Sequence, residues 1–187
     1  MEREIISELR AKLQKNLSAH RYEHSIGVEY TAAALAMRYG ADVLKAEIAG
    51  LMHDCAKEYS DEELAAKCPG EGNAKTLHAV YAPVVAREKY GIDDVEILSA
   101  MRWHTTGKAG MALLDKIVFV ADFIEPSRKM ITILPEMRRL AFTDLNYTVY
   151  RIAEETMYYL EMKNAPLDLK TKECYDWLKE NGIHDDK

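Results

Sequence analysis

Apolar residues recur at helical spacing from the start of the chain. In the N-terminal segment they fall three or four positions apart, at Ile6, Leu9, Leu13 and Leu17. This spacing predicts an amphipathic helix over about residues 3–18, and the same periodicity predicts a second helix over about residues 21–39. Gly40 follows directly, and glycine readily adopts the left-handed conformation found just after a helix end. The N-terminal part of the chain therefore favours a helical protein.

Capping residues place the next two elements. Asp42 suits the N-cap of a third helix, which we expect to end at the adjacent pair His53 and Asp54. Ser60 and Glu63 match a capping box, in which each side chain satisfies a backbone N–H at the start of a helix. A short fourth helix is therefore predicted to begin there.

A loop and a further series of helices follow. The segment 69–73 reads Pro-Gly-Glu-Gly-Asn and predicts a loop, because proline and glycine interrupt regular structure. Apolar periodicity then predicts helices over about residues 77–90, 93–104, 111–124 and 144–164, with a short segment capped by Thr171 after them. Residues 117–120 are β-prone by composition, but the longer apolar stretch around them favours a buried helix. The predicted fold class is all-α.

Size and composition indicate one domain. The chain has 187 residues, of which 48% are hydrophobic and 30% charged, a balance typical of a single globular core. No segment resembles a linker between two cores. We therefore predict one helical domain over residues 1–187, with its C-terminal helices over about residues 136–180.

Charge and cysteine content exclude several functional classes. The net charge is −6 and no stripe of Lys or Arg occurs, so an extended nucleic-acid ligand is not expected. No apolar run approaches the roughly 20 residues that span a bilayer, and the first residues are too acidic for a secretory signal. A cytoplasmic protein without a membrane segment is expected, with a homodimer as the default oligomer. Its cysteines, Cys55, Cys68 and Cys174, are expected to be reduced and unbridged.

Histidines and aspartates form the most informative pattern in the chain. Four of the six histidines take part, in the order His24, His53-Asp54, His78, His104 and Asp122. Imidazole and carboxylate are the ligands that borderline first-row metals favour, and six of them suffice for two ions that share a bridging carboxylate. The pattern predicts a metal-dependent enzyme. The alternative is that each histidine is a hydrogen-bonded residue of the core or surface.

Cationic and hydroxyl side chains accompany these ligands. Arg21 precedes His24 by three positions and shares its helix face, although a solvent-exposed arginine would look the same. Lys57, one turn after Asp54, can place an ammonium on a phosphoryl oxygen. The hydroxyl groups at Thr105 and Thr106 and the guanidinium of Arg128 also suit phosphate, with a plain loop as the alternative for the threonines. A small phosphorylated ligand is therefore predicted.

The order of these motifs resembles the HD superfamily of metal-dependent phosphohydrolases. The segment Leu51-Met-His-Asp-Cys-Ala-Lys57 has the form of that family's central motif, flanked by an earlier His and a distant Asp. More closely, three further segments are similar to the symmetrical bis(5'-nucleosyl)-tetraphosphatases of the YqeK type: His20-Arg-Tyr-Glu-His-Ser-Ile-Gly27, Trp103-His-Thr-Thr-Gly107 and Ala121-Asp-Phe-Ile-Glu-Pro-Ser-Arg128. The matching motifs cover about residues 20–128.

This resemblance implies a single HD domain and a set of site residues. It assigns the first metal to His24, His53, Asp54 and Asp122, with Asp54 suited to bridge, and places His78 and His104 at a second metal or on phosphate. Two divalent ions are implied, expected to be iron, although manganese, cobalt and zinc accept the same ligands. The implied substrate-binding residues are Arg21, His24, Asp54, Lys57, His78, His104, Thr105, Asp122 and Arg128.

The same resemblance implies a reaction. A hydroxide on the metal ions would attack one inner phosphorus of diadenosine tetraphosphate and give two ADP, with Asp54 and Lys57 as the catalytic residues. Three alternatives stay open at this point. They are another nucleotide phosphohydrolase, a diiron oxygenase on the same scaffold, and a nucleotide sensor without turnover.

Overall fold

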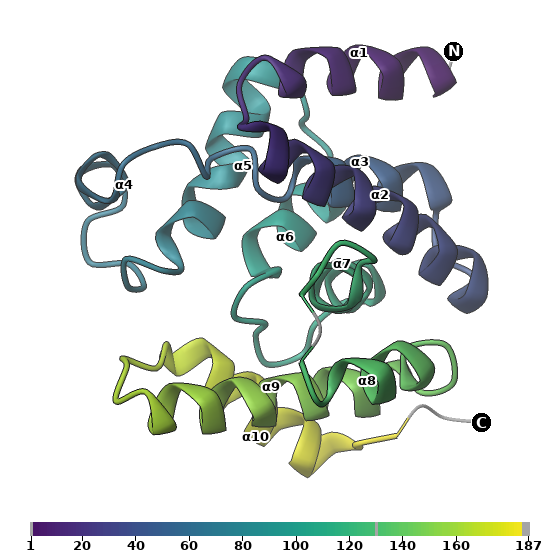
Figure 1. Cartoon of the computed structure of the whole chain (residues 1–187), viewed down its shortest axis with the longest axis vertical. Coiled ribbons are helices and arrows are strands. Elements are labelled where there is room, and N and C mark those ends of the chain that lie inside the picture. Colours follow the sequence, from purple (N-terminus) through teal and green to yellow (C-terminus); the bar gives the residue numbers. More distant parts are fainter. Residues whose placement is uncertain (1, 130, 185–187) are drawn as a thin grey trace.

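The protein is helical throughout the part of the chain that its structure describes. The structure is a computed structural model that describes residues 2–129 and 131–184, and within these ranges it contains ten α-helices and no strand (Figure 1). The prediction of an all-α fold is thus confirmed. None of the helices in the described ranges combines the length and the apolar character that crossing a bilayer requires.

The helices follow one another with short connections. In chain order they are α1 (Glu2–Gln14), α2 (Ala19–Tyr39), α3 (Val43–Met52), α4 (Asp61–Lys67), α5 (Leu77–Tyr90), α6 (Val95–Trp103), α7 (Leu113–Ile124), α8 (Leu134–Leu140), α9 (Leu145–Met162) and α10 (Leu169–Asn181).

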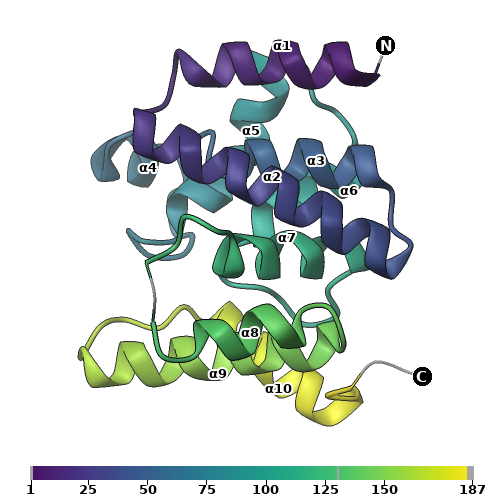
Figure 2. The same ribbon diagram turned by 45° about the vertical axis from the view of Figure 1, so that its right-hand side comes forward.

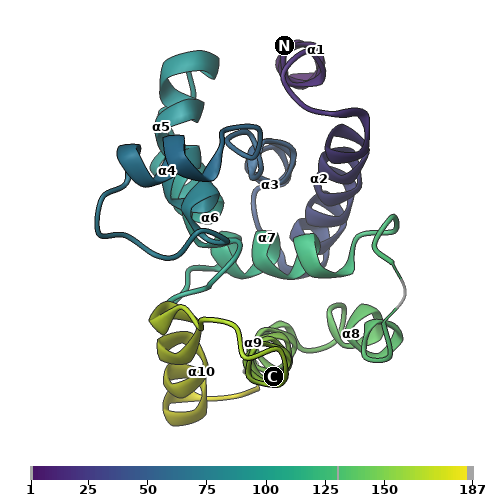
Figure 3. The same ribbon diagram turned by 60° about the vertical axis from the view of Figure 1, so that its left-hand side comes forward.

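Helix α7 lies at the middle of the molecule. It packs against α2, α3 and α6 on one side and against α8 and α9 on the other (Figures 2 and 3). Its residues Ile117, Val118 and Val120 are fully buried, which explains why a β-prone stretch forms a helix that is apolar on nearly every side. Because α2, α3 and α6 all contact α7, their ends meet around it and can build one site.

Local capping signals match the observed helix ends. Gly40 ends α2 in the left-handed conformation with φ of 72°. The Asp42 side chain accepts a hydrogen bond from the backbone N–H of Lys45 at the start of α3. Ser60 and Glu63 form the predicted capping box at α4. The buried Cys55, Cys68 and Cys174 are free thiols, as predicted.

Several helix boundaries differ from the sequence predictions, and three of them are informative. Helix α1 ends at Gln14 rather than near residue 18, and the buried Leu17 belongs to the turn that follows it. Helix α7 begins at Leu113, two residues later than predicted. Helix α10 is capped by Asp168, whose side chain accepts from the Lys170 N–H, and not by Thr171. In α1 and α7 the difference arises because a buried apolar residue, Leu17 or Met111, continues the pattern beyond the helix itself.

Helix α8 was not predicted as a separate element. It has only seven residues, so it is too short to establish a helical periodicity. Leu134 and Met137 are buried against the neighbouring helices, and Pro135 stands in its first turn, where proline needs no hydrogen bond. The C-terminal helical layer therefore begins slightly before the predicted residue 136.

Candidate metal centre

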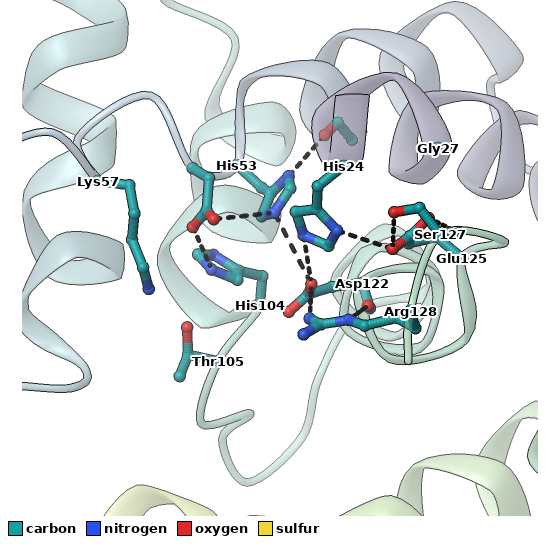
Figure 4. Close-up of polar contacts among 12 residues, drawn as sticks. His24, Gly27, His53, Lys57, His104, Thr105, Asp122, Glu125, Ser127 and Arg128 are labelled. Carbon is teal, nitrogen blue, oxygen red and sulfur yellow. Dashed lines mark hydrogen bonds and ion pairs between the residues drawn. The ribbon is translucent and has the colours of Figure 1, made fainter. Parts of the chain in front are cut away.

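One pocket gathers nearly all of the predicted site residues. It encloses about 800 Å³. Among the residues that line it are Arg21, His24, Asp54, Lys57, His78, His104, Thr105, Asp122 and Arg128. His53 is fully buried behind them, with its ring edge-on to those of His24 and His104 (Figure 4). These ten residues are thus brought together from segments far apart in the sequence. Thr106 does not line the pocket, and its buried hydroxyl donates to the Gly107 backbone oxygen at 2.9 Å.

Two of the histidines are oriented by helix ends. His53 and His104 stand at the C-caps of α3 and α6, where backbone carbonyls lack partners within the helix. The Nδ1 atom of His53 lies 2.7 Å from the Gly50 oxygen, and that of His104 lies 2.7 Å from the Met101 oxygen. Because a carbonyl can only accept, Nδ1 carries the hydrogen in both rings. In the neutral ring Nε2 is then left with a lone pair directed at the site.

His24 is oriented in another way, because it lies inside α2. Its Nδ1 atom lies 2.9 Å from Oε1 of Glu125, a carboxylate that is buried beyond the end of α7. Its Nε2 atom lies 3.0 Å from Oδ1 of Asp122, in the last turn of α7 (Figure 4). Glu125 was not among the predicted site residues.

A first ligand group consists of His24, His53 and Asp122. Each of these residues offers one ligand atom, and the three atoms lie within 4.8 Å of one another. The His53 Nε2 atom is 3.8 Å from Oδ1 of Asp122 and 3.7 Å from Oδ2 of Asp54. The group therefore leaves space for a metal ion between its members, and Asp54 borders that space.

We distinguish a second ligand group of Asp54, His78 and His104; ligand atoms of Asp54 and His104 also lie within 4.8 Å of one another and of the His53 ligand atom. Oδ1 of Asp54 lies 3.3 Å from Nε2 of His78 and 3.4 Å from Nε2 of His104, and these two nitrogens are 3.3 Å apart. Asp54 thus turns Oδ1 toward the second group and Oδ2 toward the first. This is the arrangement that a carboxylate shared by two ions requires.

Unsatisfied buried atoms support a metal at this place. Among the described residues, His53 Nε2 and Asp54 Oδ1 are buried and have no hydrogen-bond partner. A buried polar atom without a partner costs roughly 1–3 kcal/mol. A divalent cation would accept both lone pairs, so the residues present fit a metal site.

The protonation states of His53, Asp54 and Asp122 also suit metal ligands. Burial lowers the pKa of His53 to about 4, so its ring is neutral near pH 7. Burial alone would raise the pKa of Asp54, but the neighbouring histidines and Lys57 hold it well below its usual range. For Asp122 the same effect of burial is outweighed by Arg128 and His24, and its pKa is also low. Neutral imidazole and ionised carboxylate are the forms that bind metals.

The predicted phosphate-binding residues lie at the edge of this cluster. The Lys57 ammonium is 2.9 Å from Nε2 of His78, and the Thr105 hydroxyl is 3.3 Å from the same nitrogen. Burial lowers the pKa of Lys57 below that of a free lysine. Both side chains line the pocket, and Figure 4 shows Lys57 and Thr105 near His104.

The two predicted arginines are held by protein acceptors. Arg21 donates to the backbone oxygen of Lys57, and its Nε lies 3.5 Å from Oε1 of Glu58. Arg128 forms an ion pair with Asp122 Oδ1, and its Nε donates to the Asp122 backbone oxygen at 2.8 Å. Arg128 therefore orients a candidate metal ligand in addition to lining the pocket.

Sequence reasoning also missed two lysines that line the pocket. Lys75 precedes α5, and Lys129 follows Arg128. With Arg21, Lys57 and Arg128 they surround the pocket with positive charge, in a chain whose net charge is −6. No motif marked either lysine, because only the fold brings their loops to the same pocket. This concentration of cations suits a polyanionic ligand.

A helical bundle with buried histidines and aspartates at its helix ends defines a class of metal-site proteins. Comparison with known proteins gives the family. The model of the HD domain matches residues 21–127, and the chain belongs to the HD-domain family, together with relatives named as symmetrical bis(5'-nucleosyl)-tetraphosphatases. The family resemblance predicted from the sequence is therefore confirmed.

The relatives match over nearly their full length. The symmetrical bis(5'-nucleosyl)-tetraphosphatase of Bacillus subtilis (strain 168) is 40% identical over 176 residues, which cover 90% of this chain and 94% of that protein. The protein of the same name from Halalkalibacterium halodurans is 38% identical over 89% of this chain and 92% of its own length. A crystal structure from Clostridium acetobutylicum, described as a predicted HD superfamily hydrolase involved in NAD metabolism, is 34% identical with a TM-score of 0.86. It covers 93% of this chain and 96% of that one.

Proposed function

We propose that this protein is a metal-dependent hydrolase that cleaves dinucleoside tetraphosphates at their centre, converting diadenosine tetraphosphate to two ADP. The observation that carries this proposal is the position of Asp54, whose Oδ2 atom lies beside His53 and whose Oδ1 atom lies beside His78 and His104. A carboxylate placed in this way suits two ions that act together on one phosphoryl group. The names of the relatives supply the substrate class.

We assign six ligands to the two ions. His24, His53 and Asp122 would hold the first ion, and His78 and His104 would hold the second, with Asp54 shared between them. Iron is our expectation for both positions, and manganese, cobalt and zinc take the same ligands. When bound, such ions lower the pKa of a coordinated water and offset the negative charge of phosphoryl oxygens.

The cationic residues of the pocket would hold the phosphate chain. Lys57 and Thr105 lie beside His78, where an ammonium and a hydroxyl can donate to oxygens of one inner phosphate. Arg21 and Arg128 approach from the side of α2 and α7. Four phosphates carry several negative charges, so a substrate of this kind matches the concentration of cations around the pocket.

The proposed reaction is the addition of one water molecule across the central P–O–P linkage. The water oxygen forms a bond to one inner phosphorus, and the bond from that phosphorus to the central bridging oxygen breaks. One ADP gains the water oxygen, and the other leaves with the bridging oxygen. A diphosphate is a good leaving group, so Lys57 needs only to offset charge on the phosphoryl oxygens and no separate general acid is required.

Product analysis tests this proposal. The purified protein, loaded with Fe²⁺ or Mn²⁺, is incubated with diadenosine tetraphosphate in ¹⁸O-enriched water, and the products are separated by ion-exchange chromatography. We expect ADP as the sole nucleotide, with one ¹⁸O atom in half of the molecules. AMP with ATP would refute central cleavage while leaving a hydrolase. NAD⁺ serves as a second substrate in parallel, because the clostridial structure is described by its link to NAD metabolism.

Absence of turnover with every metal would point to the two remaining alternatives, an oxygenase and a nucleotide sensor. A diiron oxygenase would consume oxygen when reduced iron is present, and a sensor would bind the nucleotide without changing it. The cations around the pocket favour the hydrolase, because an oxygenase has no need of several lysine and arginine side chains.

A further inference from the structure

His24, His53 and His104 differ in which group lies against their Nδ1 atoms. His53 and His104 each use a backbone oxygen three residues earlier, which is available because both stand at helix ends. His24 lies within α2, where the backbone oxygens are occupied by the helix itself. Its Nδ1 atom is instead 2.9 Å from a carboxylate that lies 101 positions away along the chain. His24 therefore depends on Glu125 for the Nδ1 hydrogen-bond acceptor that His53 and His104 find in their own helices.

The carboxylate of Glu125 is itself held firmly. It is fully buried, and Oε2 accepts from the Ser127 backbone N–H at 2.6 Å. Oε1 accepts from the Ser127 hydroxyl at 2.7 Å in addition to facing His24. Arg138 donates to the backbone oxygens of Ile124 and Glu125 at 2.9 and 2.8 Å. Both the side chain and the backbone of Glu125 thus have fixed positions.

Gly27 provides the space for this carboxylate. It follows His24 by three positions and lies on the same face of α2 (Figure 4). A Cβ atom at this position would overlap Oε2 of Glu125 and lie 3.2 Å from its Cδ. Any residue larger than glycine would therefore push the carboxylate away from the His24 ring. The glycine is required by the approach of Glu125 and not by its own backbone conformation, because it lies within a regular helix.

We propose that Glu125 is a positioning residue for the metal centre. Gly27 leaves the space that its carboxylate occupies, and Ser127 orients that carboxylate. The carboxylate holds His24 with its hydrogen on Nδ1 and so directs the lone pair of Nε2 toward the first ligand group. A carboxylate behind a ligating imidazole fixes the tautomer and ring orientation and increases the basicity of the ligand. The metal half of this inference rests on the proposed function, and the tautomer half does not.

The first test is the tautomer of His24 in the metal-free full-length protein. Long-range ¹H–¹⁵N correlation spectra of ¹⁵N-histidine-labelled protein distinguish a hydrogen on Nδ1 from one on Nε2. The His24→Gln variant identifies the signal. We expect the Nδ1 atom of His24 to carry a hydrogen in the wild type, whether or not Nε2 is also protonated beside Asp122, and to lose it in part of the molecules in Gly27→Ala and Glu125→Ala. A wild-type His24 with a hydrogen on Nε2 alone, or an unchanged hydrogen position at Nδ1 in both variants, would overturn the inference.

The second test is metal affinity, measured by competition with a chelator for Mn²⁺ and Zn²⁺. Loss of a carboxylate behind a histidine ligand typically weakens metal binding by about 10- to 100-fold, and we expect this range for Glu125→Gln and Gly27→Ala. Ser127→Ala keeps the carboxylate but removes one donor from it, so it should weaken binding less and in the same direction. It also preserves the test should the larger changes prevent folding.

Glu29→Gln is the matched control. Glu29, which lies on α2, is also a fully buried carboxylate, and it does not line the pocket. Its partner is Arg10, whose guanidinium donates to the two Glu29 oxygens at 2.9 and 2.5 Å. Its loss should lower stability and leave metal affinity within about twofold. Equal effects of Glu29→Gln and Glu125→Gln on affinity would overturn the inference, as would a wild type that binds neither metal. A wild type that binds metal without hydrolysing diadenosine tetraphosphate would refute only the proposed function.

Discussion

The two ligand groups on either side of Asp54 are held by different kinds of neighbours. In the first group, Glu125 faces His24 and Arg128 is paired with Asp122, so residues outside the group fix its geometry. In the second group, the nearest neighbours of His78 are the Lys57 ammonium and the Thr105 hydroxyl. The ammonium and the hydroxyl both have hydrogens to donate to a ligand. We therefore propose that the first group retains an ion and that the second receives a phosphate beside one.

The largest effect is expected where both groups are disturbed at once. Asp54→Asn removes the charge that the two groups share, and asparagine offers only one oxygen. Ions in such sites contribute several kcal/mol to transition-state stabilisation, so we expect hydrolysis of diadenosine tetraphosphate to fall by roughly a thousandfold or more. Steady-state kinetics with metal-loaded protein measures the loss. Near wild-type hydrolysis by a folded Asp54→Asn protein would refute the shared role of this carboxylate.

Metal content separates the two groups from each other. His24→Ala removes a ligand of the first group, and His78→Ala removes one from the second. After dialysis against buffer without metal, elemental analysis should find the greater loss of bound ion in His24→Ala. The first group is fixed by residues outside it and should retain its ion in the wild type, so damage to this group removes the ion that dialysis would otherwise leave. Both variants should be almost inactive. Equal metal content in the two proteins would mean that the groups do not differ in retention.

Sequence reasoning found the parts of this centre that depend on local structure. His53 and His104 each stand three residues after their backbone partner, at the end of a helix that capping and periodicity predict. The contribution of Glu125 could not be found in this way, because it depends on the packing of α7 against α2 and on the space left at Gly27. A glutamate next to a proline is an ordinary helix end until the fold places a histidine against it.

The same distinction applies to the fold. Seven-residue α4 was predicted, because Ser60 and Glu63 form a capping box that can be recognised in the sequence. Helix α8 has the same length but no side-chain cap hydrogen bond, and its existence depends on burial of Leu134 and Met137 against other helices. Short helices are thus predictable when their ends carry a signal. Those stabilised only by tertiary contacts are not.

A smaller effect is expected from the cation beside the second group. Lys57→Met keeps most of the side-chain volume and removes the charge, so folding and metal content should change little. Loss of one well-placed donor to a transition-state charge typically lowers kcat by about 10²-fold. We expect kcat to fall more than KM rises. Lys45→Met is the control, because Lys45 pairs with Asp94 at 2.9 Å outside the pocket, and its kcat should equal that of the wild type.

The smallest effect is expected from the hydroxyl group that approaches the same histidine. Valine has nearly the same shape as threonine, so Thr105→Val removes one hydrogen bond and little else. Such a bond is worth about 1 kcal/mol, or roughly fivefold in rate. Because Thr105 lies beside the second group and is not one of its ligands, this loss should appear in hydrolysis and leave metal retention unchanged. Thr143→Val is the matched control, since the Thr143 hydroxyl donates to the Leu140 backbone oxygen far from the pocket. If Thr105→Val released metal as readily as His24→Ala, the two groups would not be divided into one that retains an ion and one that receives substrate.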